Sequence, residues 1–180
     1  MATGTGVYIP TTMLGDVAAT ASLVLRGDST WGVLPYAALP ATHGFAARRD
    51  ANAITFNTGA YTTCTYDVEE ADTDSAFVHT SGEYTAPATG FYLFTAKDKV
   101  GGIDDGESAI LALYVDGALK YNGERAFSPG AGLSIHTTVN AVLYLTAAQV
   151  VTCRLWHDEG ANQAQLLAAG DNWFSGVRLA

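Results

Sequence analysis

From residue 43 onward, the chain alternates between short apolar runs and clusters of Gly, Asp, Asn and Pro at intervals of about ten residues. In residues 150–156, for example, Val151, Cys153 and Leu155 share one face. A period of two is typical of β-strands, and short strands at this spacing indicate a sandwich or barrel. We therefore predict an all-β domain. Its strands are expected within residues 91–97, 109–115, 118–121, 133–145, 150–156, 165–169 and 173–180.

Turn signals separate several of these runs. Asp116-Gly117 and Asn122-Gly123 are dipeptides that favour type I′ hairpin turns. The runs 109–115 and 141–145 are apolar at nearly every position, although the outer face of a lone sandwich is normally polar. This pattern predicts that some outer faces are covered, as in a tight oligomer.

Residues 1–42 have a different pattern, without sustained alternation and with three of the five prolines. They are nevertheless too apolar for a disordered tail. We predict two parts: an N-terminal arm of residues 1–42, which becomes ordered against another protein, and a β head of residues 43–180. The candidate anchoring residues of the arm are Tyr8, Ile9, Leu25, Trp31, Leu34 and Tyr36.

The stretch GEYTAPATGFYLF, residues 82–94, combines a Gly-x-Tyr, a proline turn and a Gly-x-Tyr-x-Phe. We interpret it as a hairpin in which Pro87 sets the turn and Gly90 permits a close or positive-φ backbone. It resembles the signature of complement component 1q (C1q) and tumour-necrosis-factor-like (TNF-like) globular heads. Further matches are residues 54–57, similar to that family's first core strand, residues 113–117, and the closing Phe174-Ser175-Gly176. The signature positions are Gly82, Tyr84, Pro87, Gly90, Tyr92, Phe94, Phe174 and Gly176.

The resemblance covers roughly residues 43–180 and implies a ten-stranded antiparallel jelly-roll sandwich that assembles as a homotrimer. Aromatic side chains near the threefold axis would bury the outer faces noted above. A generic β-sandwich hairpin is the alternative interpretation of the same stretch.

Charge limits the classes of partner. Nine Lys and Arg against eighteen Asp and Glu give a net charge of −9, which disfavours nucleic acid and anionic membranes. The longest apolar runs are too short to span a bilayer, so membrane insertion is not expected. The first basic residue is Arg26, so the start lacks the charged segment of a signal peptide, and we expect synthesis in a host cytoplasm. Cys64 and Cys153 are either two buried free thiols or a single bridge.

No catalytic motif is present, and we expect no enzymatic activity. The four histidines lack ligand spacing, and His157-Asp158-Glu159 is expected in a solvated loop. The acidic runs 67–74 and 103–107 are also interpreted as solvated loops, with calcium as the alternative and no other cofactor or metal expected. Glu69 with Glu70, or Asp104 with Asp105, could serve a glycosidase, but surface charge is the simpler explanation. The aromatic residues that could stack on sugars or pack in a core or trimer are Tyr61, Tyr66, Tyr121, Trp156 and Trp173.

Heads that resemble this one also occur without stalks on bacteriophage virions, and LVLRGDSTWGVL, residues 23–34, looks like short elements of tail-fibre chains. The sequence therefore predicts a non-enzymatic virion surface protein, a trimeric receptor-binding or tail-fibre head. Its arm would contact other virion proteins, and its loops a host surface glycan or protein. Alternatives are a capsid decoration or head-fibre protein, a carbohydrate-active depolymerase, and a secreted bacterial or animal ligand of the same family.

Overall fold

The computed structural model describes residues 23–25, 31–33, 43–167 and 170–179. The chain divides into two units, Met1–Ala41 and Thr42–Ala180. In the first unit, β1 (Leu23–Leu25) pairs antiparallel with β2 (Trp31–Val33), and Leu25 lies opposite Trp31. The remaining candidate anchoring residues, Tyr8, Ile9, Leu34 and Tyr36, lie outside the described residues.

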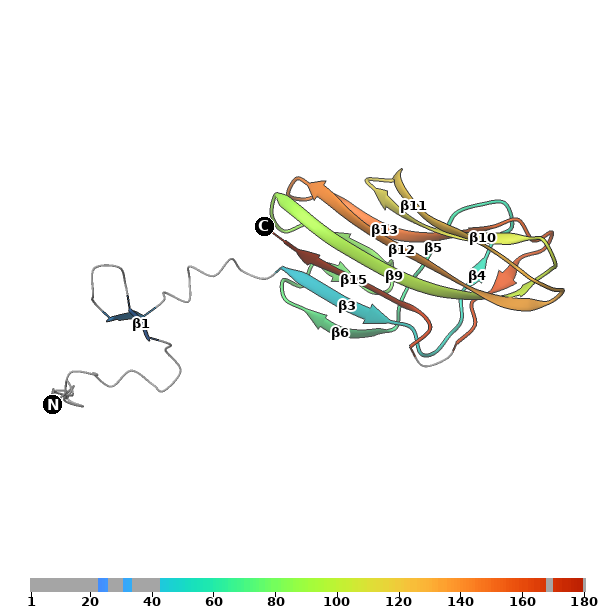
Figure 1. The fold of residues 1–180 in the computed structure, drawn as a ribbon, viewed down its shortest axis with the longest axis horizontal. Helices are drawn as coiled ribbons and strands as arrows, with labels where there is room; N and C mark the ends of the chain where they lie inside the picture. The colour runs from blue at the N-terminus through green and yellow to red at the C-terminus, as the bar shows by residue number, and fades with distance from the viewer. Residues whose placement is uncertain (1–22, 26–30, 34–42, 168–169, 180) are drawn as a thin grey trace, which may run out of the picture. The chain divides into compact units, whose positions relative to one another are not determined.

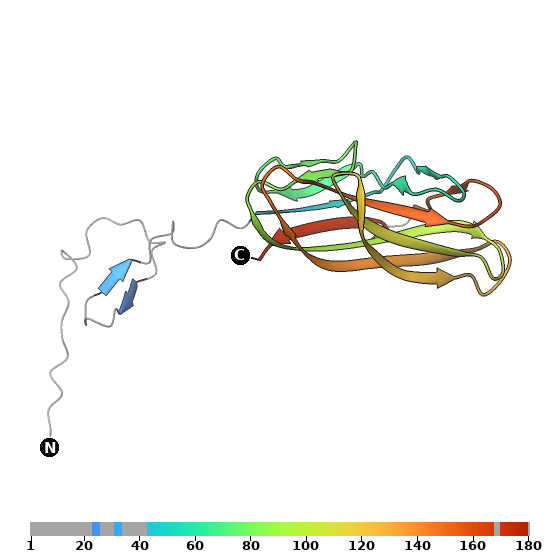
Figure 2. The same cartoon turned by 90° about the horizontal axis from the view of Figure 1, so that it is seen from above.

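The second unit is a sandwich of two antiparallel sheets, which Figures 1 and 2 show as facing layers. The five-stranded sheet has the order β12-β9-β15-β3-β6. Its strands are β3 (Gly44–Arg48), β6 (Val68–Asp72), β9 (Gly90–Ile103), β12 (Leu133–Leu145) and β15 (Trp173–Arg178).

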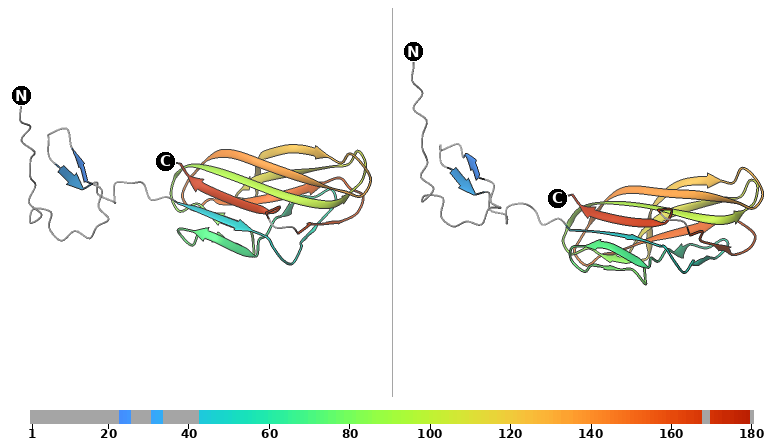
Figure 3. Two further views of the ribbon diagram at one scale, coloured as in Figure 1. Left: turned by 60° about the horizontal axis from the view of Figure 1, so that its bottom comes forward. Right: turned by 90° about the horizontal axis from the view of Figure 1, so that it is seen from below.

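The six-stranded sheet has the order β11-β10-β13-β8-β7, and the short β5 also pairs with β13. Its strands are β5 (Thr62–Thr63), β7 (Phe77–Val78), β8 (Glu83–Thr85), β10 (Ser108–Val115), β11 (Ala118–Phe127) and β13 (Val150–His157). Without β5, each of the two large sheets has five strands, which confirms the expected ten-stranded jelly roll. Figure 3 shows the two layers from further directions.

The core lies between the two sheets and is rich in aromatic rings. Phe45 of β3 stacks on Phe77 and Tyr84 of the opposite sheet, with ring centroids 4.4 and 4.6 Å apart. Phe174 of β15 meets Phe45 edge-on at 4.9 Å. Stacked and edge-on aromatic pairs add to the free energy of area burial, so these contacts fix how the two sheets are layered.

The stretch at residues 82–94 is not a hairpin, because β8 and β9 belong to opposite sheets. Pro87 lies in the bend that carries the chain from one layer to the other. The hydroxyl of Tyr92 donates to the carbonyl of Ala88 at 2.6 Å and thereby holds this bend. Gly90 begins β9 in pairing with Leu145, whereas the positive φ of this stretch, 70°, occurs at Gly82.

Two predicted turns have different outcomes. Asp116 and Gly117 have φ values of 50° and 75° and connect β10 to β11, as predicted. Asn122-Gly123, in contrast, lies inside β11, where the register with β10 shifts. A β-bulge inserts one extra residue without ending the strand, and glycine suits this position because a Cβ there would lie 2.9 Å from the carbonyl oxygen of Leu111.

Four further predictions require correction. The acidic run 67–74 is not a loop but contains β6, an edge strand that pairs with β3. Residues 54–57 contribute only β4 (Thr55–Phe56), which pairs with β14 (Gln163–Ala164) outside the two large sheets. No strand occupies the described part of 165–169, where Gln165 forms an isolated bridge with Val100. The strand predicted at 91–97 continues to Ile103.

Among the residues described, no helix is long and apolar enough to cross a membrane.

Candidate binding surfaces

The outer face of the five-stranded sheet is apolar over the part nearest the chain's C-terminal end. Phe91 pairs with Tyr144, and their rings meet edge-on at 5.2 Å, although 51% and 60% of the two residues remain exposed. Val142 pairs with Leu93 in the next row, and Leu179 follows β15 beside Phe91. We call these five exposed residues the apolar face: Phe91, Leu93, Val142, Tyr144 and Leu179.

The other part of the same outer face is charged. Lys97 and Lys99 of β9 contact the carboxylate of Asp171 at 3.3 and 3.0 Å. The hydrogen bond from Lys99 lowers the pKa of Asp171, and burial together with the nearby Lys97 lowers the pKa of His136. The outer face of this sheet is therefore apolar in one half and carries paired charges in the other.

The outer face of β10 differs from the apolar face. Ile110, Ala112 and Tyr114 are at alternate positions of β10 and share its outer face. Ala112 and Tyr114 are nevertheless buried. The ring of Tyr61 meets Tyr114 edge-on at 5.4 Å, and the guanidinium of Arg154 lies 4.3 Å from the centre of the same ring. The apolar run 109–115 is thus covered by its own chain, whereas in the run 141–145 Val142 and Tyr144 are exposed.

The aromatic signature residues lie in the core, whereas Pro87 is exposed in the bend between β8 and β9. Tyr84, Tyr92, Phe94 and Phe174 are fully buried between the sheets. The absence of a side chain at Gly176 of β15 leaves room for the rings of Phe94 and Phe45. A Cβ at this position would lie 2.6 Å from Phe94 and 2.8 Å from Phe45. The buried signature positions therefore support the fold and do not line an exposed site.

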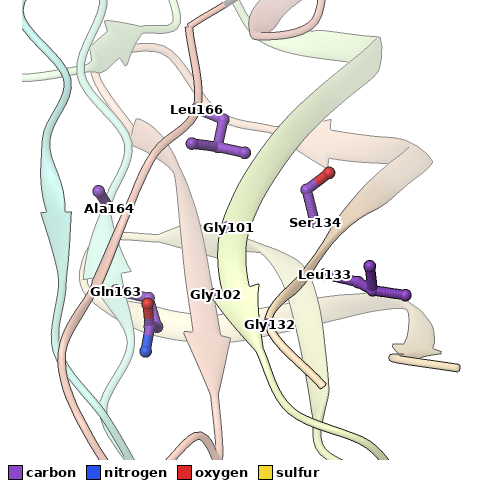
Figure 4. A pocket seen from close by; sticks show the side chains of 8 residues that line it. All are labelled: Gly101, Gly102, Gly132, Leu133, Ser134, Gln163, Ala164 and Leu166. Carbon is purple, nitrogen blue, oxygen red and sulfur yellow. The ribbon is translucent and has the colours of Figure 1, made fainter. Parts of the chain in front are cut away.

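The pocket in Figure 4 lies where Gly101 and Gly102 of β9 carry no side chain. It has a volume of about 490 Å³, and Leu166 closes over Gly101. The lining residues are Gly101, Gly102, Gly132, Leu133, Ser134, Gln163, Ala164 and Leu166. Because none of these side chains titrates in the physiological range, the pocket offers no acid or base for catalysis.

In each candidate carboxylate pair, one carboxylate is already bound to another group. Glu69 and Glu70 lie in β6 where its register with β3 shifts, and Glu70 pairs with Arg48. Asp104 accepts a hydrogen bond from the backbone N–H of Gly132 at 2.9 Å. Charged side chains on the edge strand β6 discourage edge-to-edge pairing with another chain, which is a sufficient role for them.

The histidines are also separated. His157 is not in a solvated loop but ends β13, fully buried, with Nε2 3.1 Å from the carbonyl oxygen of Phe56. His43 contacts Asp74 at 2.9 Å on the other sheet. Within the described residues, no group of three or more His, Cys, Asp or Glu is placed to hold a metal ion.

A buried polar cluster surrounds Asp98 of β9. Its carboxylate accepts hydrogen bonds from Nε2 of Gln165 at 2.9 and 3.0 Å and from the backbone N–H of Lys99 at 2.9 Å. Burial outweighs these bonds and raises the pKa of Asp98 to about 7. Cys64 and Cys153 are free and buried, and burial raises the pKa of the Cys64 thiol well above its usual value.

The sequence predicted some of these positions but missed others. Of the aromatic residues considered for sugar stacking, Tyr66 is buried in the core, while Tyr121 is exposed on β11. The sequence does not predict that Arg125 lies beside Trp156, because the two residues belong to different strands, β11 and β13. The signal available in the sequence was the alternation in residues 150–156, which places Arg154 and Trp156 on one face.

Neither a protein-family model nor a curated protein matches the sequence. Solved structures do match. The globular domain of zebrafish complement 1qA is 16% identical, with a TM-score of 0.56 over 77% of this chain and 98% of that one. The Eiger TNF from S. frugiperda is 13% identical, with a TM-score of 0.58 over 77% of this chain and 93% of that one. Murine APRIL is 11% identical, with a TM-score of 0.56 over 77% of this chain and 99% of that one.

These matches cover 77% of the chain, a share similar to that of the jelly-roll unit Thr42–Ala180. This chain therefore has the antiparallel jelly-roll fold of C1q and TNF-like globular heads.

Proposed function

We propose that this chain is a non-enzymatic surface protein of a bacteriophage virion. Its head forms a homotrimer through the apolar face, the arm of residues 1–42 attaches it to other virion proteins, and the trimer binds a molecule on the host surface. The observation that carries the proposal is the apolar face itself. Exposed aromatic and aliphatic side chains gathered in one patch are characteristic of an interaction surface.

The energy available at this face suits self-association. An aromatic side chain has about 150–250 Å² of surface, so the exposed parts of Phe91 and Tyr144 together leave roughly 200 Å² in water. At about 25 cal/mol per Å², burying this pair contributes about 5 kcal/mol for each protomer. Three protomers that bury the same face around one axis add this contribution three times, which offsets the cost of association.

The virion setting is supported by the sequence of the arm. Residues 23–34 look like a tail-fibre element, and in this segment the structure pairs Leu25 with Trp31 between the antiparallel strands β1 and β2. A trimer also gives three identical binding sites, and many trimers on one particle convert weak contacts into strong attachment.

Replacement of Tyr144 by Ser tests the assembly. We expect the purified full chain to have a mass close to three times 18.8 kDa in analytical ultracentrifugation at micromolar concentration. The exposed part of Tyr144 corresponds to roughly 3 kcal/mol for each protomer, so Y144S should weaken association by about a hundredfold or more. Val78→Ser is the matched control, because Val78 is half exposed in β7 of the other sheet. A wild-type mass of one chain across the concentration range would refute the assembly.

Gold-labelled antibody against the head, applied to the source particles, tests the location. Label at the tail tip supports a receptor-binding protein. Label over the capsid would instead identify a decoration or head-fibre protein, the second role that the arm allows. No label on any particle would refute the virion proposal and leave the measured assembly unaffected.

A further inference from the structure

The outer face of the six-stranded sheet carries aromatic rings and two arginines side by side. In one row, Arg125 of β11, Ile110 of β10 and Trp156 of β13 are register partners. In the next outward row, Ala112 lies between Asn122 and Arg154. We call the following residues the aromatic–arginine strip: Tyr61, Tyr114, Arg125, Phe127, Arg154 and Trp156.

Both guanidinium groups lie on aromatic rings. The Cζ of Arg125 is 5.0 Å from the ring centre of Trp156 and 5.9 Å from that of Phe127. The Cζ of Arg154 is 4.3 Å from the ring centre of Tyr114, and its Nε donates to the hydroxyl of Thr152 at 3.2 Å. Stacking on a ring holds a guanidinium in place and leaves its edge donors free.

These two arginines lack the acceptors that other arginines of the head have. Arg48 is paired with carboxylates, Arg49 donates to three backbone carbonyl oxygens, and Arg178 donates to that of Thr89. Neither Arg125 nor Arg154 is in an ion pair or bonds to a carbonyl oxygen within the part of the chain that the structure describes.

The surrounding acidic groups do not neutralise the strip. Glu124 precedes Arg125 in β11 and lines, together with Thr138 and Asn140 of β12, a hollow between these two strands. Glu83 lies at the end of the Tyr114 row and accepts a hydrogen bond from Ser81, while Asp158, beyond Trp156, accepts two from Ser108. In a protein of net charge −9, two arginines that form no ion pair among the described residues and share one surface point to an anionic ligand.

We propose that the aromatic–arginine strip binds a carboxylated polysaccharide, such as a uronic-acid chain, and that this is the host surface molecule to which the trimer attaches. The apolar faces of sugar rings would stack on Trp156 and the half-exposed Phe127. The guanidinium forks of Arg125 and Arg154 bind sugar carboxylates in a bidentate geometry. Tyr61 donates its hydroxyl hydrogen to Asn122 at 3.0 Å, so its ring is held across the sheet before any ligand arrives.

A single-stranded nucleic acid also stacks on aromatic rings, but it carries one phosphate per nucleotide and requires an extended basic groove. The strip offers only two cations in an acidic protein, which favours a ligand with fewer charges than a nucleic acid. The identity of the ligand rests on the proposed function, whereas the binding chemistry of the strip can be tested on the isolated chain.

The test is isothermal titration calorimetry of the full chain with tetragalacturonate and with tetramannuronate. The methyl ester of the same galacturonate tetramer is the neutral control ligand. We expect binding of at least one charged tetramer, little binding of the ester, and weaker binding at high salt. Arg125→Gln and Phe127→Ala should each lower the affinity about tenfold or more, because both residues are exposed and their loss leaves the core intact. Lys120→Gln, a change at an exposed cation outside the strip, should bind like the wild type.

Binding of neither tetramer at millimolar concentration overturns the proposal. So does equal binding of the ester, unchanged affinity in both variants, or preferential binding of a single-stranded oligonucleotide. Sedimentation of the same samples measures the oligomeric state independently of saccharide binding. A monomer that binds the saccharide refutes the trimer alone, and a trimer that binds none refutes the strip alone.

Discussion

Replacement of Asp98 by Asn should change how the stability of the head depends on pH. Asp98 is completely buried in β9, and its carboxylate receives hydrogen bonds from Gln165 and from the backbone of Lys99. Asparagine has nearly the shape of a protonated aspartic acid and cannot ionise. The Oε1 atom of Gln165 has no hydrogen-bond partner among the described residues, so after rotation of its amide it can accept from the amide group that the D98N substitution introduces.

The magnitude follows from the difference in pKa between the two states. Burial raises the pKa of Asp98 from 3.8 to about 7 in the folded protein. Between these two pH values the folded state holds a proton that the unfolded state has lost, so the contribution of Asp98 to stability falls as the pH rises. It is fully present below pH 3.8 and is lost as the pH passes about 7. A shift of about 3 pKa units corresponds to about 4 kcal/mol.

Urea unfolding at fixed protein concentration, followed by circular dichroism from about pH 3.5 to about pH 8.5, brackets both pKa values and measures this contribution. The free energy of unfolding of D98N minus that of the wild type should rise by several kcal/mol over this range. The comparison removes the effects of other carboxylates, such as Asp171, which titrate in both proteins. Asp105→Asn, a change at an exposed aspartate, is the control and should leave the profile unaltered. A D98N profile parallel to that of the wild type would show that Asp98 stays ionised in the fold and would refute the reasoning.

Two further predictions concern the core. Gly176→Ala should destabilise the head by about 1–3 kcal/mol, seen as a lower urea midpoint, because the new Cβ would lie 2.6 Å from the ring of Phe94. Unchanged stability would show that the two rings can move apart freely. A thiol reagent such as Ellman's reagent should label neither cysteine in the native protein at about pH 8 and both after denaturation, because Cys64 and Cys153 are buried and the pKa of Cys64 is raised. Rapid labelling of the native protein would contradict the buried position of these thiols.

The parts of the fold that could be predicted from the sequence are those that local patterns determine. Alternating side chains in 133–145 and 150–156 indicated β12 and β13, because a period of two is imposed by the backbone of a single strand. The turn at Asp116-Gly117 was also predictable, since both residues accept a positive φ.

The errors occurred where distant segments decide the structure. Asn122-Gly123 has the composition of a turn, but the carbonyl of Leu111 approaches Gly123 so closely that the glycine serves a bulge. The stretch around Pro87 changes sheets, and no local pattern distinguishes such a crossover from a hairpin. The acidic run 67–74 forms a strand because its backbone pairs with β3, a segment that lies earlier in the chain.

The difference between local patterns and contacts of distant segments also explains why the sequence indicated the apolar face but not the aromatic–arginine strip. An apolar outer face is visible in the sequence because Val142 and Tyr144 belong to one strand. The aromatic–arginine strip was not visible, because Arg125 and Trp156 come from different strands and meet only through the register of β10 between them.

The two surfaces lie on opposite sheets, and this arrangement determines how they can work together. The inner faces of both sheets are used by the shared core, so the apolar face and the aromatic–arginine strip point away from each other. The proposed self-association through Phe91 and Tyr144 would therefore leave Trp156 and Arg125 accessible. A trimer built on the apolar face would carry three strips on its outside, and three weak sites on one rigid body bind a repeating polymer far more strongly than one site does. A Y144S monomer should accordingly keep the affinity of the wild type for a single tetrasaccharide and lose it for the long polymer.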